Sequence, residues 1–431
     1  MYSLIDFGVT KDVGTLKNGA RVVLFKRIGA PISTTVAFKA GSRFDPVGKE
    51  GLAHFTEHML FKKTKMFKTE TELSEYVEEI GGDLNAGTGS EELDFYVDIS
   101  DKCDYPKVVT VVNEVFNNMI PDDKFFEIEK DVILKEIANM RSNPRKYVYD
   151  IADDLFFQKT NLGRSCIGSE ETVSGINTAD ISNDYSEKLN PGRMTIIVSG
   201  DIELSELIDL YNSGMTYPNI DREKKVFYNF LPIKRERAIL TEKYEDTDNN
   251  HLVFGFRTCS LFDLDHIPLA VLATVCGSGD AGCSLFKRLR GENGLVYGVH
   301  VNLSSQTDSG VWAVVTSTTK ENLQKLFDLV CEEFARVYEG GITNDELELA
   351  KNKIIKSKKR RMQTSRSWVN FHTSEELFNP DNPLNLDDYM NRVSAVSLND
   401  LKRVGEKYFK EKTWYLAMCG NAEEKDFKIN Y

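Results

Sequence analysis

Two histidines and a glutamate lie within the five-residue segment His54 to His58. The spacing of apolar residues from Gly51 to Thr64 predicts a helix, and helical residues four apart lie one turn apart on the same face. His54 and His58 can therefore reach one tetrahedral zinc ion at about 2.0–2.1 Å. Glu57 shares that face and can take a proton from water bound to the metal. The pattern HxxEH, which is HExxH reversed, predicts a zinc metallopeptidase. The alternative is two packed or solvated histidines on a helix.

Further candidate ligands follow on a helix that is predicted from Lys124 to Arg141. Glu129 and Glu136 are seven residues apart, so both lie on one face of that helix. A catalytic zinc takes three protein ligands and keeps one position open. One glutamate can be the third ligand while the other orients a histidine. The spacing does not say which, and two surface carboxylates on an amphipathic helix would show the same pattern.

The order of predicted elements indicates a duplicated chain of the α+β class. In the first half we expect strands within 17–42 and at 94–100 and 194–199, and helices at 51–64, 70–80, 108–119 and 124–141. In the second half we expect strands at 251–258, 296–303, 310–316 and 414–419, and helices at 268–275, 285–290, 321–338 and 344–362. Part of the charged segment 218–237 is the predicted linker. These patterns predict two domains, residues 1–222 and 223–431.

The charge balance argues against a nucleic-acid partner. The chain has 431 residues and a net charge of -13, whereas nucleic-acid-binding proteins are usually basic. Residues 1–222 hold 37 acidic and 25 basic side chains, and residues 223–431 hold 30 and 29. The half with the candidate zinc ligands is therefore the acidic one. This favours a substrate that is cationic on average, although a solvated acidic surface would give the same balance.

The seven cysteines are scattered and form no CxxC pair, which suits reduced thiols better than a disulfide framework. The first residues show no basic region followed by an apolar run, so no signal peptide is predicted. No stretch approaches the roughly 18 apolar residues that a membrane helix needs. We therefore expect a cytoplasmic protein that is not inserted in a membrane.

Several blocks resemble the pitrilysin family of zinc metallopeptidases, also called the insulinase or mitochondrial-processing-peptidase family. Gly41 to Thr64 is similar to the family's zinc-helix region, Gly81 to Glu92 to its Gly-Gly…Asn-Ala segment, and Glu129 to Ile137 to its third-ligand helix. Leu285 to Val299 resembles the family's Arg…Tyr motif. The resemblance covers nearly the whole chain. It implies two homologous domains of the α/β-sandwich type, each a mostly antiparallel sheet covered by helices, that form half of a clam-shell chamber.

The resemblance also assigns roles around the metal. It implies that His54, His58 and Glu136 bind Zn²⁺, that Glu57 is the general base, and that Glu129 supports the site beside them. The choice of Glu136 over Glu129 as the ligand follows from the resemblance alone.

For the substrate, the resemblance implies four further residues. Asn85 and Ala86 are expected on an edge strand near the metal, where a peptide adds as a further strand through main-chain hydrogen bonds. Arg290 and Tyr297 are expected to contact the substrate carbonyl or the developing oxyanion. Without the resemblance, a surface ion pair for Arg290 and strand packing for Tyr297 are the simpler interpretations.

The resulting hypothesis is a zinc endopeptidase that hydrolyses peptides or unfolded segments inside a chamber. Half-size members of the family tend to pair, so a homodimer is expected. The alternative, from a different class, is a non-catalytic peptide-binding or scaffold subunit, since several relatives have lost the metal. The complete HxxEH motif and the presence of both motifs in one chain favour the enzyme.

Overall fold

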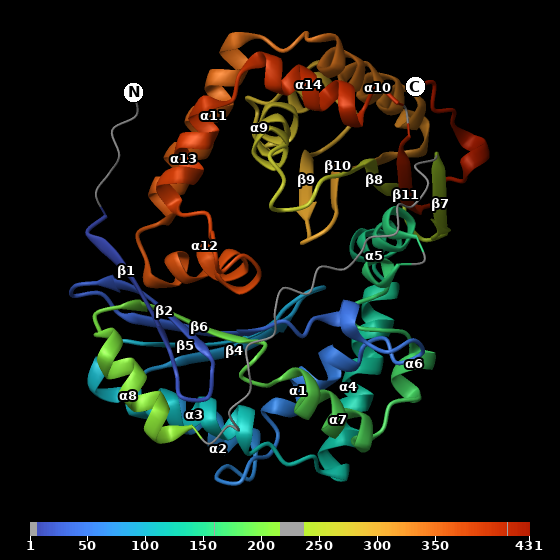
Figure 1. The fold of residues 1–431 in the computed structure, drawn as a ribbon. Helices are drawn as coiled ribbons and strands as arrows, with labels where there is room; N and C mark the ends of the chain where they lie inside the picture. Colours follow the sequence, from blue (N-terminus) through green and yellow to red (C-terminus); the bar gives the residue numbers. More distant parts are fainter. Residues whose placement is uncertain (1–6, 159, 216–236, 412) are drawn as a thin grey trace. The chain divides into compact units, whose positions relative to one another are not determined.

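The computed structural model of the chain describes residues 7–158, 160–215, 237–411 and 413–431. The described residues divide into two compact units, each built around one sheet (Figure 1). The first unit comprises segments Met1–Ile137, Arg164–Val226 and Lys359–Asn385, and the second comprises Ala138–Gly163, Phe227–Lys358 and Leu386–Tyr431. Each unit therefore includes a segment from the other half of the sequence.

The first unit contains a six-stranded sheet with strand order β1-β2-β6-β3-β5-β4. Strands β2 and β6 are parallel, and the other neighbours are antiparallel. The Asn18-Gly19 turn joins the first two strands, and Gly19 has a φ of 88°, which glycine adopts without a Cβ penalty. The strands are β1 (Val9–Thr15), β2 (Arg21–Arg27), β3 (Ile32–Phe38), β4 (Asp83–Thr88), β5 (Leu93–Ile99) and β6 (Met194–Gly200).

Helices of the first unit form two groups. One group packs on the sheet, where alternating β-strand residues and the apolar faces of α3 and α8 share a single hydrophobic core. The other group joins α1, α4 and α7 through a separate apolar cluster. The helices are α1 (Leu52–Leu60), α2 (Glu70–Glu78), α3 (Tyr105–Asn117), α4 (Asp123–Arg141), α6 (Glu170–Ser174), α7 (Thr178–Lys188), α8 (Leu204–Gly214) and α12 (Ser365–Phe378).

The second unit repeats this strand pattern. Its five-stranded sheet has the order β7-β11-β8-β10-β9, in which β7 and β11 are parallel and the other neighbours are antiparallel. This is the pattern of β2-β6-β3-β5-β4 in the first unit, and no strand among the described residues takes the position of β1. The strands are β7 (Ala238–Lys243), β8 (Asn249–Thr258), β9 (Val299–Ser305), β10 (Gly310–Thr319) and β11 (Tyr415–Gly420). The expected duplicated α+β fold is confirmed.

The helices of the second unit follow in a similar chain order. Helix α9 is apolar almost all round and is largely buried, as expected for such a helix. The segment 285–290 was predicted to be helical, and it forms a π-helix, η4 (Phe286–Glu292). The α-helices are α5 (Pro144–Phe157), α9 (His266–Gly277), α10 (Leu323–Glu339), α11 (Asn344–Arg361), α13 (Leu386–Ala395) and α14 (Leu398–Tyr408).

Two helices are exchanged between the halves of the sequence. Helix α5, from the first half, packs on β8 and β11 of the second sheet, and α12, from the second half, packs on β3 and β6 of the first sheet. Figure 1 shows α12 on the face of the first sheet opposite to α3 and α8. The predicted boundary between residues 222 and 223, and all but the last residue of the predicted linker 218–237, lie outside the described residues. The predicted domain boundary stays a prediction.

No described helix combines the length and the apolar character needed to cross a lipid bilayer.

Candidate metal centre

A buried carboxylate holds the N-terminus of helix α1. The Asp45 carboxylate, fully buried, accepts hydrogen bonds from the backbone N–H of Gly51 at 3.0 Å and of Ala53 at 3.1 Å. The Lys188 ammonium group lies 3.2 Å from the same carboxylate. Burial raises the pKa of Asp45 to about 7, and Lys188 opposes that rise. A negatively polarised group at a helix N-terminus satisfies free N–H groups and interacts favourably with the helix dipole.

Gly51 allows the chain to approach a neighbouring loop at this helix start. Its φ is 92°, and a Cβ at this position would lie 2.7 Å from the carbonyl oxygen of Ile167. A larger residue would therefore both strain the backbone and push the loop away. The first turn of α1 is thus fixed by a side-chain cap and by close backbone packing.

The apolar face of α1 sets its position on α4. The rings of Phe55 and Phe126 stack with centroids 4.7 Å apart. Leu52 and Met59 on α1 and Ile133 and Ile137 on α4 belong to the same buried cluster. The other face of α1 carries the two histidines and Glu57. The packing therefore brings the glutamates of α4 to the histidines of α1.

Three potential ligand atoms converge between the two helices. The Nε2 atoms of His54 and His58 lie 3.9 and 3.8 Å from one carboxylate oxygen of Glu136. Ligand atoms of the three side chains all lie within 4.8 Å of one another. These separations are too long for hydrogen bonds and suit donors that surround a cation. Two imidazoles and a carboxylate are a usual donor set for catalytic zinc, so the residues present fit this metal.

Burial favours the neutral form of His54. It lowers the pKa of this imidazole to about 4, and the nearby His58 adds to that effect. A histidine must be neutral to donate its lone pair to a metal. The Nδ1 atom of His54 is buried and has no hydrogen-bond partner within the described part of the chain.

Glu129 contacts the opposite nitrogen of His58. Its carboxylate lies 3.0 Å from His58 Nδ1 and 3.0 Å from the Lys62 ammonium group. Burial opposes ionisation of Glu129, but His58 and Lys62 outweigh it and hold the pKa of Glu129 below its usual range. For His58, burial acts to lower the pKa, and the hydrogen bond to Glu129 with the nearby carboxylates raises it overall. With Nδ1 bonded to Glu129, His58 presents Nε2 toward Glu136.

Glu57 is held by the neighbouring strand. The Thr88 hydroxyl, at the end of β4, donates a hydrogen bond of 2.6 Å to the Glu57 carboxylate. Burial raises the pKa of Glu57, and this hydrogen bond acts in the opposite direction. A carboxylate with a raised pKa is a stronger base than a solvated one.

A cavity of about 620 Å³ adjoins Glu57 and His58. Strand β4, at the end of the first sheet, forms one wall, and it carries the predicted substrate residues Asn85 and Ala86. Asn85 is exposed and lines the cavity, whereas Ala86 is half-buried and does not. The lining residues are Glu57, His58, Phe61, Lys62, Glu70, Ser74, Val77, Glu78, Gly82, Asp83, Leu84, Asn85, Glu129 and Val132.

Arg290 and Tyr297 lie together in the second unit. The Arg290 guanidinium group stands 4.9 Å from the centre of the Tyr297 ring and 5.1 Å from that of Phe286. The Tyr297 side chain is 86 % exposed. Within the described residues, Arg290 has no carboxylate partner, so the simpler interpretation of a surface ion pair does not hold there.

The sequence analysis missed three residues of this centre. Asp45 lies in the block 41–64, and Thr88 is the threonine of the Gly-Gly…Asn-Ala…Thr…Glu pattern in the block 81–92, but neither residue was given a role. Lys62 directly follows the zinc helix. Their positions inside these blocks were the available signal, but their contacts depend on the fold.

Comparisons with known proteins identify the family. A family model described as insulinase (peptidase family M16) matches residues 21–170, and one described as the peptidase M16 inactive domain matches residues 175–354. The chain belongs to peptidase family M16, the insulinase family.

Its relatives include proteins named as zinc proteases. An uncharacterized zinc protease of Bacillus subtilis is 28 % identical over 410 residues, which cover 92 % of this chain and 95 % of that protein. The mitochondrial-processing peptidase subunit beta of Bos taurus is 24 % identical over 421 residues, covering 96 % and 84 %. The crystal structure of a protease from Helicobacter pylori matches with a TM-score of 0.88 at 21 % identity, covering 95 % of this chain and 99 % of that one. The last comparison supports the fold.

Proposed function

We propose that this protein is a zinc-dependent endopeptidase in which His54, His58 and Glu136 hold the metal and Glu57 is the general base. The observation that carries the proposal is the convergence of three ligand atoms within 4.8 Å beside Glu57, a half-buried glutamate on the helix of the two histidines. Zinc bound there would polarise the scissile carbonyl and increase the acidity of a bound water. Together with a base, these two effects would lower the barrier to hydrolysis of a peptide bond.

The side chains around the metal prepare these groups for reaction. Glu57 takes the proton from the attacking water, and Thr88 keeps its carboxylate in place through the 2.6 Å hydrogen bond. Glu129 orients His58 and balances the Lys62 charge. Because the base and its support come from different elements, α1 and β4, their relative position depends on the packed core of the first unit.

The edge of the first sheet offers a binding site for an extended peptide. Strand β4 pairs with β5 on one side only, so the main chain at Asn85 and Ala86 can bond a substrate strand. The adjoining cavity carries five carboxylates and one ammonium group, and the latter is already paired with Glu70 and Glu129. This charge balance supports a preference for cationic segments.

Arg290 and Tyr297 complete the proposal. A guanidinium group that has no carboxylate partner in the described part of the chain and an exposed phenol can donate hydrogen bonds to a substrate carbonyl as negative charge develops on it. We further propose that the protein acts in the cytoplasm as a homodimer that encloses its substrate in a chamber. The bovine relative is named as a subunit, so a requirement for a second, different chain is one outcome of the test.

Comparing wild type with Glu57→Gln tests the proposal. Both proteins, loaded with zinc, are given a quenched-fluorescent peptide pool with basic and acidic members. The variant keeps its zinc and loses about 10²–10⁴-fold in kcat/KM, because only the base is removed. Equal inactivity of both zinc-loaded proteins would favour the non-catalytic scaffold or a missing partner subunit. Equal rates for basic and acidic peptides would remove the charge preference but leave the peptidase.

A further inference from the structure

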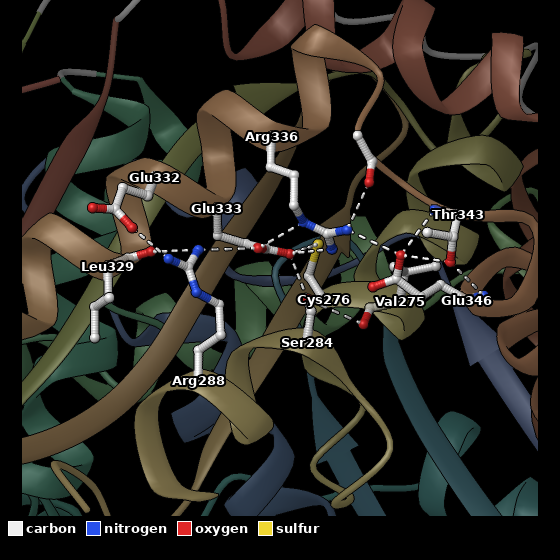
Figure 2. Close-up of polar contacts among 11 residues, drawn as sticks. Val275, Cys276, Ser284, Arg288, Leu329, Glu332, Glu333, Arg336, Thr343 and Glu346 are labelled. Atoms are coloured by element: carbon white, nitrogen blue, oxygen red, sulfur yellow. Dashed lines mark hydrogen bonds and ion pairs between the residues drawn. The ribbon is translucent and has the colours of Figure 1, made fainter. Parts of the chain in front are cut away.

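A fully buried glutamate lies at the centre of a charged network in the second unit. Glu333, on α10, contacts two arginines (Figure 2). Arg336 donates to its carboxylate through Nε at 2.9 Å and Nη2 at 2.7 Å, and Arg288 Nη1 lies 3.5 Å away. The Ser284 hydroxyl donates to one of its oxygens, and the Cys276 thiol lies 3.8 Å from that same oxygen. Such a carboxylate is costly to bury and is retained only when it is fully paired.

The network of Glu333 contacts η4 at two points, just before its start at Ser284 and in its middle at Arg288. Ser284 immediately precedes Leu285, the residue at the N-terminus of the π-helix, and Arg288 lies within it. Arg288 also donates to the Leu329 carbonyl oxygen at 3.4 Å and pairs with Glu332. One side chain of α10 thus connects to two points of a segment that is distant in the sequence.

Arg290 takes no part in the network of Glu333. Residues two apart on a helix do not share a face. Arg288 therefore points to α10, while Arg290 is exposed over the Phe286 and Tyr297 rings. The chain beyond η4 is held by hydrogen bonds from the Thr318 hydroxyl to the Leu295 carbonyl oxygen, at 2.6 Å, and from Thr316 to Gly298, at 2.7 Å. Arg290 lies between Arg288 and the attachment at Leu295, and Tyr297 lies between the attachments at Leu295 and Gly298.

A π-helix needs such support. Hydrogen bonds between residues five apart are rare in proteins, and they occur most often as short bulges at functional sites. A seven-residue π-helix is less favourable on its own than an α-helix, so tertiary contacts must stabilise it. We propose that Glu333 is a positioning residue which, through Arg288 and Ser284, fixes η4 so that Arg290 and Tyr297 face the substrate together.

This inference rests on the proposed function, and a double-mutant cycle tests it. Glu333→Gln keeps the shape of the side chain and removes its charge. The matched control is Glu332→Gln. The side chain of Glu332 is 63 % exposed and pairs with the same Arg288. Glu333→Gln should lower kcat by about tenfold with little change in KM or bound zinc, and Glu332→Gln should change kcat less than about twofold. In an Arg290→Ala background, Glu333→Gln should cause less than about a twofold further loss.

Equal losses from Glu333→Gln with and without Arg290 would overturn the proposal, because the role would then be general stability. An equal effect of Glu332→Gln would overturn it as well. Hydrogen exchange at residues 286–298 provides a readout that does not need activity. It should accelerate in Glu333→Gln and stay unchanged in Glu332→Gln, and unchanged exchange in both would contradict the proposal even if the protein proves not to be a peptidase. If Glu333→Gln fails to fold, Ser284→Ala removes one contact of the network and takes its place in both measurements.

Discussion

The two units of the molecule share one strand pattern but place their polar residues differently. The first helix after the third strand of the pattern is α1 in the first unit, and it presents His54, Glu57 and His58 on a partly open face. In the second unit, the first α-helix after the matching strand β8 is α9. Its ionisable residues are His266 and the buried thiol Cys276, and most of the helix is buried. The matched scaffold therefore does not determine chemistry, which depends on a few side chains. The description of the second family model as an inactive domain fits this difference.

A buried carboxylate contacts the segment that carries the candidate site residues in each unit. In the first, Asp45 bonds the backbone at the start of α1. In the second, Glu333 binds the side chains of Ser284 and Arg288 around η4. The two carboxylates come from different positions in the repeated pattern, a loop and a helix. The units thus reach similar support by different contacts, which is expected if their sites have separate tasks.

The largest expected effect is the loss of bound metal when a histidine is removed from the first unit but not from the second. His58→Ala removes a ligand, so the protein should lose its bound zinc and at least about a thousandfold in kcat/KM. His266→Ala, in the helix that follows the corresponding strand, should keep both. Metal content by atomic absorption and peptide hydrolysis check this result.

Zinc retained in full by His58→Ala, or lost equally in His266→Ala, would contradict the assignment of the metal to the first unit. The fold of each variant is checked by circular dichroism, because removing a partly buried imidazole also leaves a small gap beside Glu129.

The exchanged helices form the next comparison. Helix α5 meets the second sheet through apolar side chains, including Phe156, whose ring lies 5.1 Å from that of Tyr415. Helix α12 meets the first sheet partly through charge. Arg366 bonds Asp98 through Nε at 3.1 Å and the Thr35 hydroxyl at 2.6 Å. Apolar burial and ion pairs respond differently to salt.

Phe156→Ala should lower the free energy of unfolding by about 3–5 kcal/mol, because it leaves a cavity between helix and sheet. Arg366→Met should cost about 1.5–3 kcal/mol at low salt and less at high salt. Urea unfolding at two salt concentrations measures both. Tyr149→Ala, on the exposed side of α5, is the control and should change stability little. A salt dependence for Phe156→Ala that matches that of Arg366→Met would contradict the contrast between the two interfaces.

Local spacing predicted much of the fold and part of the candidate site. The segment His54 to His58 is readable because its geometry depends on one helix turn. The choice of Glu136 over Glu129 needed the family resemblance, since both residues share a helix face. The structure brings Glu136 to both Nε2 atoms and Glu129 to Nδ1 of His58, a difference that comes from how α1 packs on α4.

Contacts between distant residues explain what the sequence did not reveal. Lys188 reaches Asp45 across 143 residues, and Ser365 of α12 donates to the Pro31 carbonyl oxygen across 334 residues. No periodic pattern reports such pairs, so the exchange of α5 and α12 was not predicted. The π-helical form of 286–292 was also missed, because a short apolar pattern fits both kinds of helix.

The smallest expected effect is a pH dependence of stability that comes from Glu92 in the first unit. Glu92 precedes β5 and lies 3.4 Å from the Ser374 hydroxyl of α12, whereas Ser309 precedes the matching strand β10. Burial raises the pKa of Glu92 to about 7, the charge of Asp94 adds to this, and Ser374 opposes it. The folded protein therefore keeps this proton up to about pH 7, whereas the unfolded chain releases it near pH 4.5.

The contribution of Glu92 to the free energy of unfolding is therefore complete below about pH 4.5 and is lost as the pH rises through 7. Glu92→Gln cannot ionise, so its stability relative to wild type should increase between pH 5 and pH 8 by about 1–3 kcal/mol. Thermal unfolding at the two pH values measures this change, with the exposed Glu79→Gln as the control. A difference between Glu92→Gln and wild type that is the same at both pH values would mean that Glu92 is ionised throughout. The first sheet would then meet α12 through an ionised Glu92 in addition to the pairing of Arg366 with Asp98, and its contrast with the apolar second interface would be larger.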